Sequence, residues 1–119
     1  MITYTDHVRT YVDFLLSAQD ISRPLKIVCD CSNGPTGLVI GKLKPHLLKY
    51  VDIIVINDTL DPDFSAHGAD PTNAAALKDA EKAILKHGAD LGVVFDGDGD
   101  RAVFLNEKGG RIPSHVIAA

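Results

Sequence analysis

The sequence predicts an α/β domain, a three-layer αβα sandwich with a mostly parallel sheet and an antiparallel hairpin at its C-terminal edge. Strand-like and helix-like segments alternate along the chain in the order typical of doubly wound domains. The expected strands are short and largely apolar, as in sheets that are buried on both faces. Because 119 residues, 45% of them hydrophobic, fit one domain with one core, we treat residues 1–119 as a single α/β domain.

The first half of this pattern begins with an amphipathic helix that ends at the Ser-Arg-Pro sequence of residues 22–24. Its apolar residues recur three or four positions apart: Tyr4, Val8, Tyr11, Val12 and Leu15. A strand over Leu25–Cys31 leads into the SNGPTG segment (residues 32–37), a polar turn that contains two glycines. A second helix is expected over Leu38–Tyr50, and Pro45 is expected either to kink it or to lie near the start of its second half.

The middle of the chain is predicted as a strand, a long loop and a helix. Val51–Ile56 is a nearly continuous apolar run, which indicates a buried strand. The long loop (residues 57–72) contains four aspartates, two prolines and a glycine, and loops of this length are usually functional or interfacial. Thr72 or Asn73 can cap the next helix, and Gly88 ends it. Its expected apolar stripe comprises Leu77, Ala80, Ile84 and Leu85.

The last predicted elements are a buried strand and a hairpin. The strand Leu91–Phe95 runs directly into a cluster of aspartates. Ala102–Asn106 and Arg111–Pro113 then flank a Glu-Lys-Gly-Gly turn, which predicts an antiparallel pair. Ser114 is a typical helix N-cap, but the chain stops five residues later at Ala119. We therefore expect a fragment of a longer, multidomain protein.

Composition excludes several classes of function. A net charge of −4 and a pI near 5.6 provide no basic surface for nucleic acid, so no nucleic-acid partner is expected. No apolar run reaches the roughly 18 residues of a membrane span, and the N-terminus lacks the pattern of a signal peptide. Cys29 and Cys31 match neither a redox pair nor a metal knuckle, so we expect buried thiols in a reducing cytoplasm.

The strongest chemical signal is the aspartate loop, Asp96-Gly97-Asp98-Gly99-Asp100-Arg101 (residues 96–101). Three carboxylates this close repel one another unless a cation holds them, and Mg²⁺ and Ca²⁺ both take oxygen ligands. The glycines permit the backbone dihedrals that a tight turn requires. Because ligands gather at the carboxyl ends of parallel strands, this loop and the SNGPTG segment are expected at one edge of the sheet.

Calcium binding is one alternative interpretation of the aspartate loop, either in an EF-hand or in another non-catalytic module. Asp96, Asp98 and Asp100 occupy positions 1, 3 and 5 of an EF-hand loop, and Glu107 occupies position 12. Position 6, however, is Arg101 instead of glycine, and the flanking segments are predicted as strands instead of helices. A third interpretation is that the aspartate loop is a solvated acidic turn that binds no ion and has no function.

Two further alternatives involve phosphate chemistry. A haloacid-dehalogenase-like phosphatase also places two aspartates after an apolar strand, but its motif has Thr or Val where this chain has Asp100. Only 19 residues follow Asp100, too few for the downstream catalytic residues of such an enzyme. Gly97, Gly99 and Ala102 formally match a dinucleotide fingerprint, yet a strand follows and the acids would repel a pyrophosphate.

The segment LGVVFDGDGDR resembles the metal loop of the second domain of the α-D-phosphohexomutases, the phosphomannomutase/phosphoglucomutase family. The resemblance extends from about Leu25 to the C-terminus and includes the strand, the SNGPTG segment and the Gly-Gly turn. It implies that Asp96, Asp98 and Asp100 bind Mg²⁺ together with a phosphoserine oxygen, and that Arg101 contacts a phosphate or a carboxylate. The implied reaction interconverts hexose 6-phosphate and hexose 1-phosphate.

The chain also departs from this family pattern. The family's phosphoserine lies in a T-x-S-H-N-P-like loop of the preceding domain, which residues 64–68 (FSAHG) do not match, so Ser65 is not assigned that role. Other domains would supply the phosphoserine and the phosphosugar, and the chain alone is predicted to be inactive. His67 could face the site, although a loop histidine is more often a surface residue or an interdomain contact.

Overall fold

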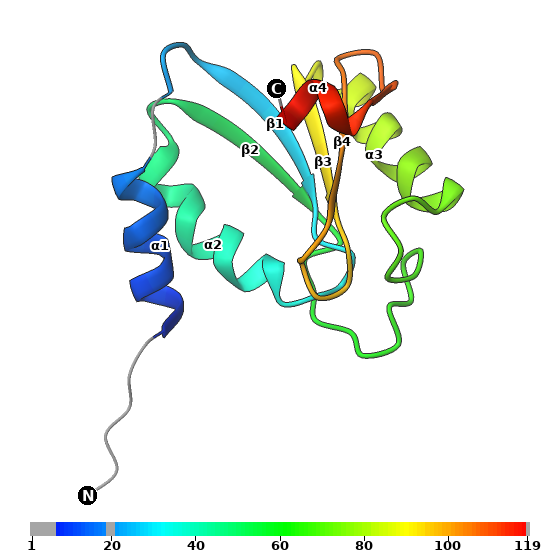
Figure 1. Cartoon of the computed structure of the whole chain (residues 1–119), viewed down its shortest axis with the longest axis horizontal. Helices are drawn as coiled ribbons and strands as arrows, with labels where there is room; N and C mark the ends of the chain where they lie inside the picture. The colour runs from blue at the N-terminus through cyan, green and yellow to red at the C-terminus, as the bar shows by residue number, and fades with distance from the viewer. Residues whose placement is uncertain (1–6, 19–20, 119) are drawn as a thin grey trace, which may run out of the picture.

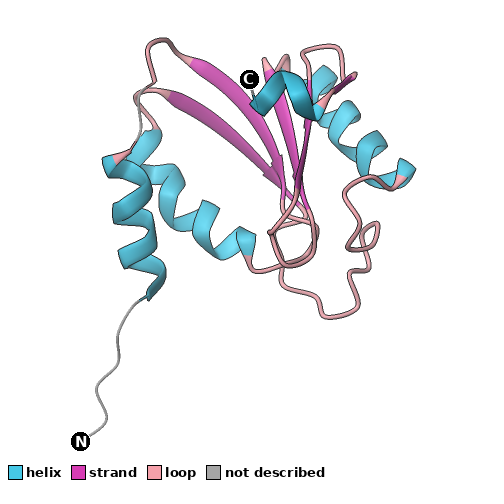
Figure 2. Cartoon of the chain, viewed as in Figure 1, coloured by secondary structure: helices cyan, strands magenta, loops and turns pink. Residues whose placement is uncertain are grey.

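The computed structural model describes residues 7–18 and 21–118 and contains a sheet with helices on both sides (Figures 1 and 2). In chain order the elements are α1 (His7–Ser17), β1 (Leu25–Asp30), α2 (Thr36–Leu47), β2 (Val51–Ile56), α3 (Ala74–His87), β3 (Leu91–Phe95), β4 (Ala102–Leu105), β5 (Arg111–Ile112) and α4 (Ser114–Ala118). Tyr4, expected in the first helix, lies outside the described residues.

The sheet has five strands in the order β2-β1-β3-β4-β5. The strand β1 lies in the middle of a parallel block, and its Cys29 is paired with Val55 of β2 and with Val93 of β3. The strands β4 and β5 extend the sheet as an antiparallel hairpin beside β3. The predicted mostly parallel sheet with an antiparallel edge hairpin is confirmed.

Alternate residues of the strands face two separate hydrophobic clusters, one on each face of the sheet. Val28 of β1 packs with α3, whereas its neighbour Cys29 packs on the α2 side. The buried residues of the α3 side are Val28, Ala76, Ala80, Ala83, Ile84, Ala89, Val94, Val103 and Leu105. Those of the α2 side are Cys29, Cys31, Ile40, Leu47, Val51 and Ile53. With α1 packed on α2, this is the predicted three-layer αβα sandwich.

Two details of the predicted helices are wrong. The helix α2 runs from Thr36 to Leu47 and contains Pro45, so it starts two residues and ends three residues earlier than expected. On α3, Leu85 is 60% exposed. It lies five residues after Ala80, which rotates it about 140° around the helix axis and away from the sheet. Small alanines occupy the buried stripe in its place.

Local capping follows the chemistry of the sequence. The Asn73 side chain accepts a hydrogen bond from the amide of Ala75 at 2.9 Å, and Gly88 ends α3 in the left-handed conformation. In the hairpin, the Asn106 side chain accepts bonds from the amides of Lys108 and Gly110, both at 2.9 Å. Asparagine side chains therefore fix the N-terminal end of α3 and the hairpin turn, and a glycine in the left-handed conformation fixes the C-terminal end of α3.

The two cysteines are buried free thiols, as predicted. Burial raises the pKa of Cys29 to about 11 and that of Cys31 to about 12, so both thiols stay protonated and unreactive near neutral pH. Among the residues that the structure describes, no helix has the length and hydrophobicity needed to cross a bilayer.

Candidate metal centre

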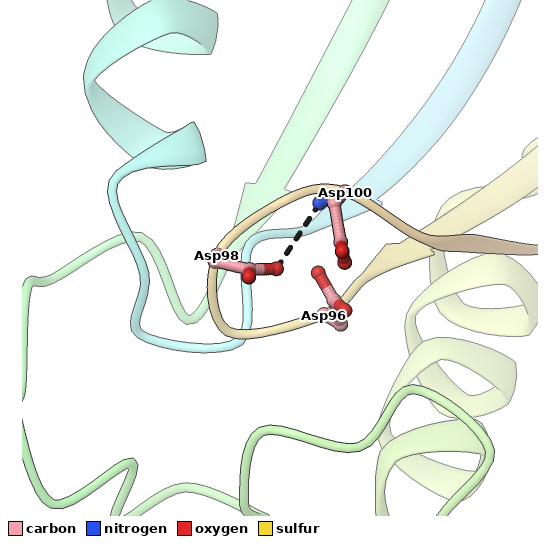
Figure 3. Close-up of side chains that lie close together, drawn as sticks. All are labelled: Asp96, Asp98 and Asp100. Carbon is pink, nitrogen blue, oxygen red and sulfur yellow. Dashed lines mark hydrogen bonds between the residues drawn. The ribbon is translucent and has the colours of Figure 1, made fainter.

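The aspartate loop connects β3 to β4 at the carboxyl end of the parallel strands, at the lower end of the sheet in Figure 1. Figure 3 shows its three aspartate side chains directed toward one another. Asp96 is 4% exposed, while Asp98 and Asp100 reach solvent. One carboxylate oxygen of each residue lies within 4.8 Å of the other two. The three ligands that the sequence predicted are thus brought together in space.

This spacing is compatible with one small cation. Mg²⁺ takes oxygen ligands at about 2.1 Å, so its ligand oxygens lie at most about 4.2 Å apart, slightly closer than the 4.8 Å within which the three carboxylate oxygens lie here. The three candidate ligand atoms are all oxygens, the ligand type that suits hard cations such as Mg²⁺ and Ca²⁺. The residues present therefore fit Mg²⁺ in donor type and in proximity.

Arg101 closes the aspartate loop by binding its first residue. The Arg101 Nε donates to Asp96 Oδ2 at 2.9 Å, and the Arg101 amide donates to Asp96 Oδ1 at 3.4 Å. The same Nε lies 3.9 Å from Asp100 Oδ1, and the arginine side chain remains 64% exposed. Of the two contacts that the sequence allowed for Arg101, the carboxylate contact is present in the structure.

Hydrogen bonding within the loop separates the pKa values of its carboxyl groups. Burial raises the pKa of Asp96, but hydrogen bonds with the side chains of Asp100 and Arg101 outweigh burial and hold it well below its usual range. Hydrogen bonds with the carboxyl groups of Asp96 and Asp98 raise the pKa of Asp100 to about 6. A cation that binds Asp100 would therefore compete with a proton for this carboxyl group.

The two glycines of the loop serve different purposes. Gly99 has φ +77°, a left-handed conformation that L-residues rarely adopt, and its amide donates to the Asp96 carbonyl at 3.1 Å. Gly97 does not have positive φ. A Cβ at this position would lie 2.8 Å from Ala69 Cβ and from Phe64 Cε1. The predicted role in backbone dihedrals is thus confirmed for Gly99, whereas Gly97 is required by close packing against the long loop.

The SNGPTG segment packs against the aspartate loop from the other side. A Cβ on Gly34 would collide with the carbonyl of Gly97. The Ser32 hydroxyl donates to the carbonyl of Phe95, the residue immediately before the first aspartate. Ser32 and Asn33 have φ values of +50° and +56°, and such strain in non-glycine residues is common around functional sites.

Asn33 connects the SNGPTG segment to the long loop, a role that sequence reasoning missed. Its side chain donates to the Thr59 carbonyl at 2.9 Å and accepts from the Ala66 amide at 3.1 Å. Its backbone donates to Asn57 and accepts from Asp61. An asparagine in a turn is an ordinary sequence signal, so nothing in the sequence distinguished it from a local turn former.

The prediction for His67 is wrong, since its side chain is fully buried inside this domain. It is neither at the surface nor available to another domain. Its Nε2 lies 2.8 Å from Oδ2 of Asp30, the last residue of β1, whose side chain is also fully buried. The only available signal was Asp30 itself, a charged residue at the end of an apolar strand.

A hollow of about 430 Å³ opens beside the aspartate loop, on the side where the long loop lies. It is lined by Phe64, Ala69, Asp70, Asp96, Gly97, Asp98 and Arg101. Acidic side chains, one arginine and one aromatic ring thus line the same hollow. The EF-hand alternative is excluded, because the strands β3 and β4 flank the loop where that motif has helices.

Residues 3–109 match the family described as phosphoglucomutase/phosphomannomutase, alpha/beta/alpha domain II. A phosphomannomutase from Salmonella montevideo is 35% identical over 117 residues, which cover 96% of this chain and 25% of that protein. A phosphomannomutase/phosphoglucomutase from Pseudomonas aeruginosa is 35% identical over 91 residues, which cover 75% of this chain and 19% of that protein.

The same assignment follows from a solved structure. A phosphoglucomutase/phosphomannomutase family protein from Burkholderia thailandensis superposes with a TM-score of 0.80 at 30% identity, over 90% of this chain and 23% of that one. The chain spans about a quarter of the length of the curated relatives it matches. Domain match, sequence identity and fold agree, and the chain belongs to the phosphoglucomutase/phosphomannomutase family, in which it corresponds to the α/β/α domain II.

Proposed function

We propose that this chain is the Mg²⁺-binding domain of a phosphohexomutase, which interconverts hexose 6-phosphate and hexose 1-phosphate through a phosphoserine in another domain. The observation that carries the proposal is the convergence of Asp96, Asp98 and Asp100 within 4.8 Å in a chain of this family. Membership of the family also removes the phosphatase alternative. The proposed location is the cytoplasm, which is consistent with the two free thiols.

In this proposal the three aspartates hold Mg²⁺, which would supply Lewis-acid stabilisation of charge on a transferring phosphoryl group. Asp96 is the most constrained ligand, because it is buried and bonded to Arg101 through both carboxylate oxygens. Asp98 and Asp100 are more exposed and can adjust to the ion. Arg101 orients Asp96, and its exposed guanidinium can also donate to a phosphate that reaches the hollow.

The remaining parts of such an active site are proposed to lie outside this chain. The hollow beside the aspartate loop is open and its wall holds three aspartates, so a phosphorylated substrate needs added positive charge to bind there. The ion would supply part of that charge, and the phosphosugar-binding groups and the phosphoserine would come from other domains. The identity of the hexose would be decided by those domains.

Titration of the 119-residue chain with Mg²⁺ in a calorimeter tests the proposal. We expect weak binding, because the phosphoserine oxygen is absent, and no binding by the triple variant Asp96→Asn, Asp98→Asn, Asp100→Asn. The matched control is the variant Asp52→Asn, Asp79→Asn, Glu107→Gln, which removes the same charge from exposed or half-buried positions outside the aspartate loop and the long loop. Equal heats from the wild type and the aspartate-loop variant would rule out the proposed site.

A further inference from the structure

Asp30 and His67 form a buried polar pair that the proposed metal site does not include. Both side chains are inaccessible to solvent, and the His67 Nε2 lies 2.8 Å from Asp30 Oδ2. The two residues are 37 positions apart, at the end of β1 and in the long loop. Neither residue lines the hollow beside the aspartate loop.

The surroundings of the pair satisfy each of its polar atoms. Asp30 Oδ1 accepts from the Ser32 amide at 2.9 Å, and Oδ2 also accepts from the Asn57 side chain at 3.1 Å. The His67 Nδ1 donates to the Gly68 carbonyl at 2.9 Å, since a carbonyl oxygen can only accept. Removal of one partner would leave the other buried without its hydrogen bond, which is strongly unfavourable.

Two short routes lead from this pair to the aspartate loop. Asp30 binds the amide of Ser32, whose hydroxyl donates to Phe95, the residue before Asp96. On the other side, the Ala69 carbonyl, two residues after His67, accepts from the Gly97 amide at 2.9 Å. The pair therefore connects to the aspartate loop at both of the residues that flank Asp96.

The pair also joins strained segments that would otherwise relax. Ser32 and Asn57, both bonded to Asp30, have positive φ values of +50° and +53°. Such conformations are unfavourable for residues other than glycine and persist only where surrounding contacts enforce them. Asp30 is thus the common acceptor that keeps the ends of β1 and β2 in these conformations.

We propose that His67 and Asp30 are positioning residues for the aspartate loop, an inference that rests on the Mg²⁺ site proposed above. The buried pair clamps the long loop to the end of β1, and both partners transmit that constraint to Phe95 and Gly97. The pair touches neither the ion nor a substrate. It determines whether Asp96 is held ready to bind.

Two substitutions of His67 distinguish a role in positioning the aspartate loop from a role in the stability of the whole fold. His67→Asn keeps a donor near the Nδ1 position but removes the contact with Asp30, whereas His67→Gln keeps a donor near Nε2. We expect His67→Asn to weaken Mg²⁺ binding about tenfold or more, because loss of a group that orients a metal ligand has an effect of this size. We expect His67→Gln to keep most of the wild-type affinity. Ile84→Ala, in the α3 cluster, is the control for a comparable loss of stability without change in Mg²⁺ affinity.

The measurements are an NMR titration with Mg²⁺ and amide hydrogen exchange in the ion-free protein. Support for positioning is faster exchange at Gly97 in His67→Asn, with protection in the α3 core unchanged, together with weaker Mg²⁺ binding. If the wild type binds Mg²⁺ and His67→Asn binds it equally well, the positioning role is excluded. If the wild type does not bind Mg²⁺, the proposed function fails, and exchange at Gly97 alone then decides whether the pair holds the loop.

Discussion

Within one loop of six residues, identical side chains have different electrostatic environments. Asp96 is buried and bonded to Arg101, and its pKa lies well below the usual range. Asp100 is exposed and faces two other carboxyl groups, which raise its pKa to about 6. The difference comes from the hydrogen bond between these two carboxyl groups, which lowers the pKa of Asp96 and raises that of Asp100, and from the two hydrogen bonds that Arg101 donates to Asp96. Asp96 is therefore ionised at any ordinary pH, whereas Asp100 must lose a proton to bind a cation when the pH is below about 6.

We predict that Mg²⁺ affinity is constant above pH 6 and falls about tenfold per pH unit below it, because the ion and a proton compete for Asp100. Calorimetric titrations at pH 5, 6 and 7 test this. Asp100→Asn is the control, expected to bind more weakly with a flatter pH profile. Identical wild-type affinities at pH 5 and pH 7 would contradict the assignment of Asp100 as a ligand.

The same pKa shifts have opposite consequences for the stability of the ion-free protein. Asp100 binds its proton more tightly when folded, so its contribution to stability is lost as pH rises from about 4 to 6. Asp96 has a lowered pKa, so its contribution is present near pH 7 and is lost on acidification below the usual aspartate range. A bound cation removes the first effect, because it stabilises the charged form of Asp100.

At the scale of elements, the site depends on three parallel strands that end at one level. Asp30 in β1 is paired with Ile56 in β2 and Val94 in β3, so the residues that follow these strands emerge side by side. The SNGPTG segment, the long loop and the aspartate loop are therefore neighbours in space, and Figure 2 shows these loops gathered at one end of the sheet. The helix α3 fixes the far end of the long loop, because it begins directly after it.

We predict that Asn73→Ala lowers the free energy of unfolding by about 1 kcal/mol, because the amide of Ala75 loses its capping acceptor. Urea denaturation with an unchanged m-value is the measurement. Asn73→Ser retains a capping oxygen and is expected to stay within a few tenths of a kcal/mol of the wild type. A similar loss of stability in both variants would show that the cap does not account for the effect.

At the scale of the whole molecule, this domain presents its aspartate loop on an open edge instead of inside a closed pocket. The hollow beside it is lined by residues of the aspartate loop and the long loop. The relatives that the chain matches are about four times as long. Under the proposed function, the open edge is where the domains that carry the phosphoserine and bind the sugar meet the ion.

We predict that the purified 119-residue chain shows no hexose-phosphate mutase activity, because the proposed phosphoryl carrier and sugar-binding groups lie outside it. A coupled assay that detects conversion between hexose 1-phosphate and hexose 6-phosphate, with Mg²⁺ present, is the measurement. A full-length phosphomannomutase serves as the positive control. Robust turnover by the short chain would overturn the division of the active site between domains.

Much of the architecture followed from the sequence because strands, helices and caps are determined by residues close together along the chain. The apolar runs of β2 and β3, the Asn73 cap and Gly88 predicted their elements within a few residues. The candidate ligands were equally predictable, since Asp96, Asp98 and Asp100 lie within five residues of sequence and the turn between β3 and β4 brings their carboxylates close together.

Only the tertiary structure decided what surrounds and positions those ligands. His67 and Asp30 have no periodicity or motif in common, and they meet because the long loop folds back over the end of β1. The requirement for glycine at position 97 depends on Ala69 and Phe64, which approach it from the long loop. The sequence by itself determined a metal-binding type of loop after a buried strand. The long-range contacts that hold this loop depend on packing. Two polar residues that are distant in sequence come together in the interior, where loss of either would leave the other without its hydrogen bond.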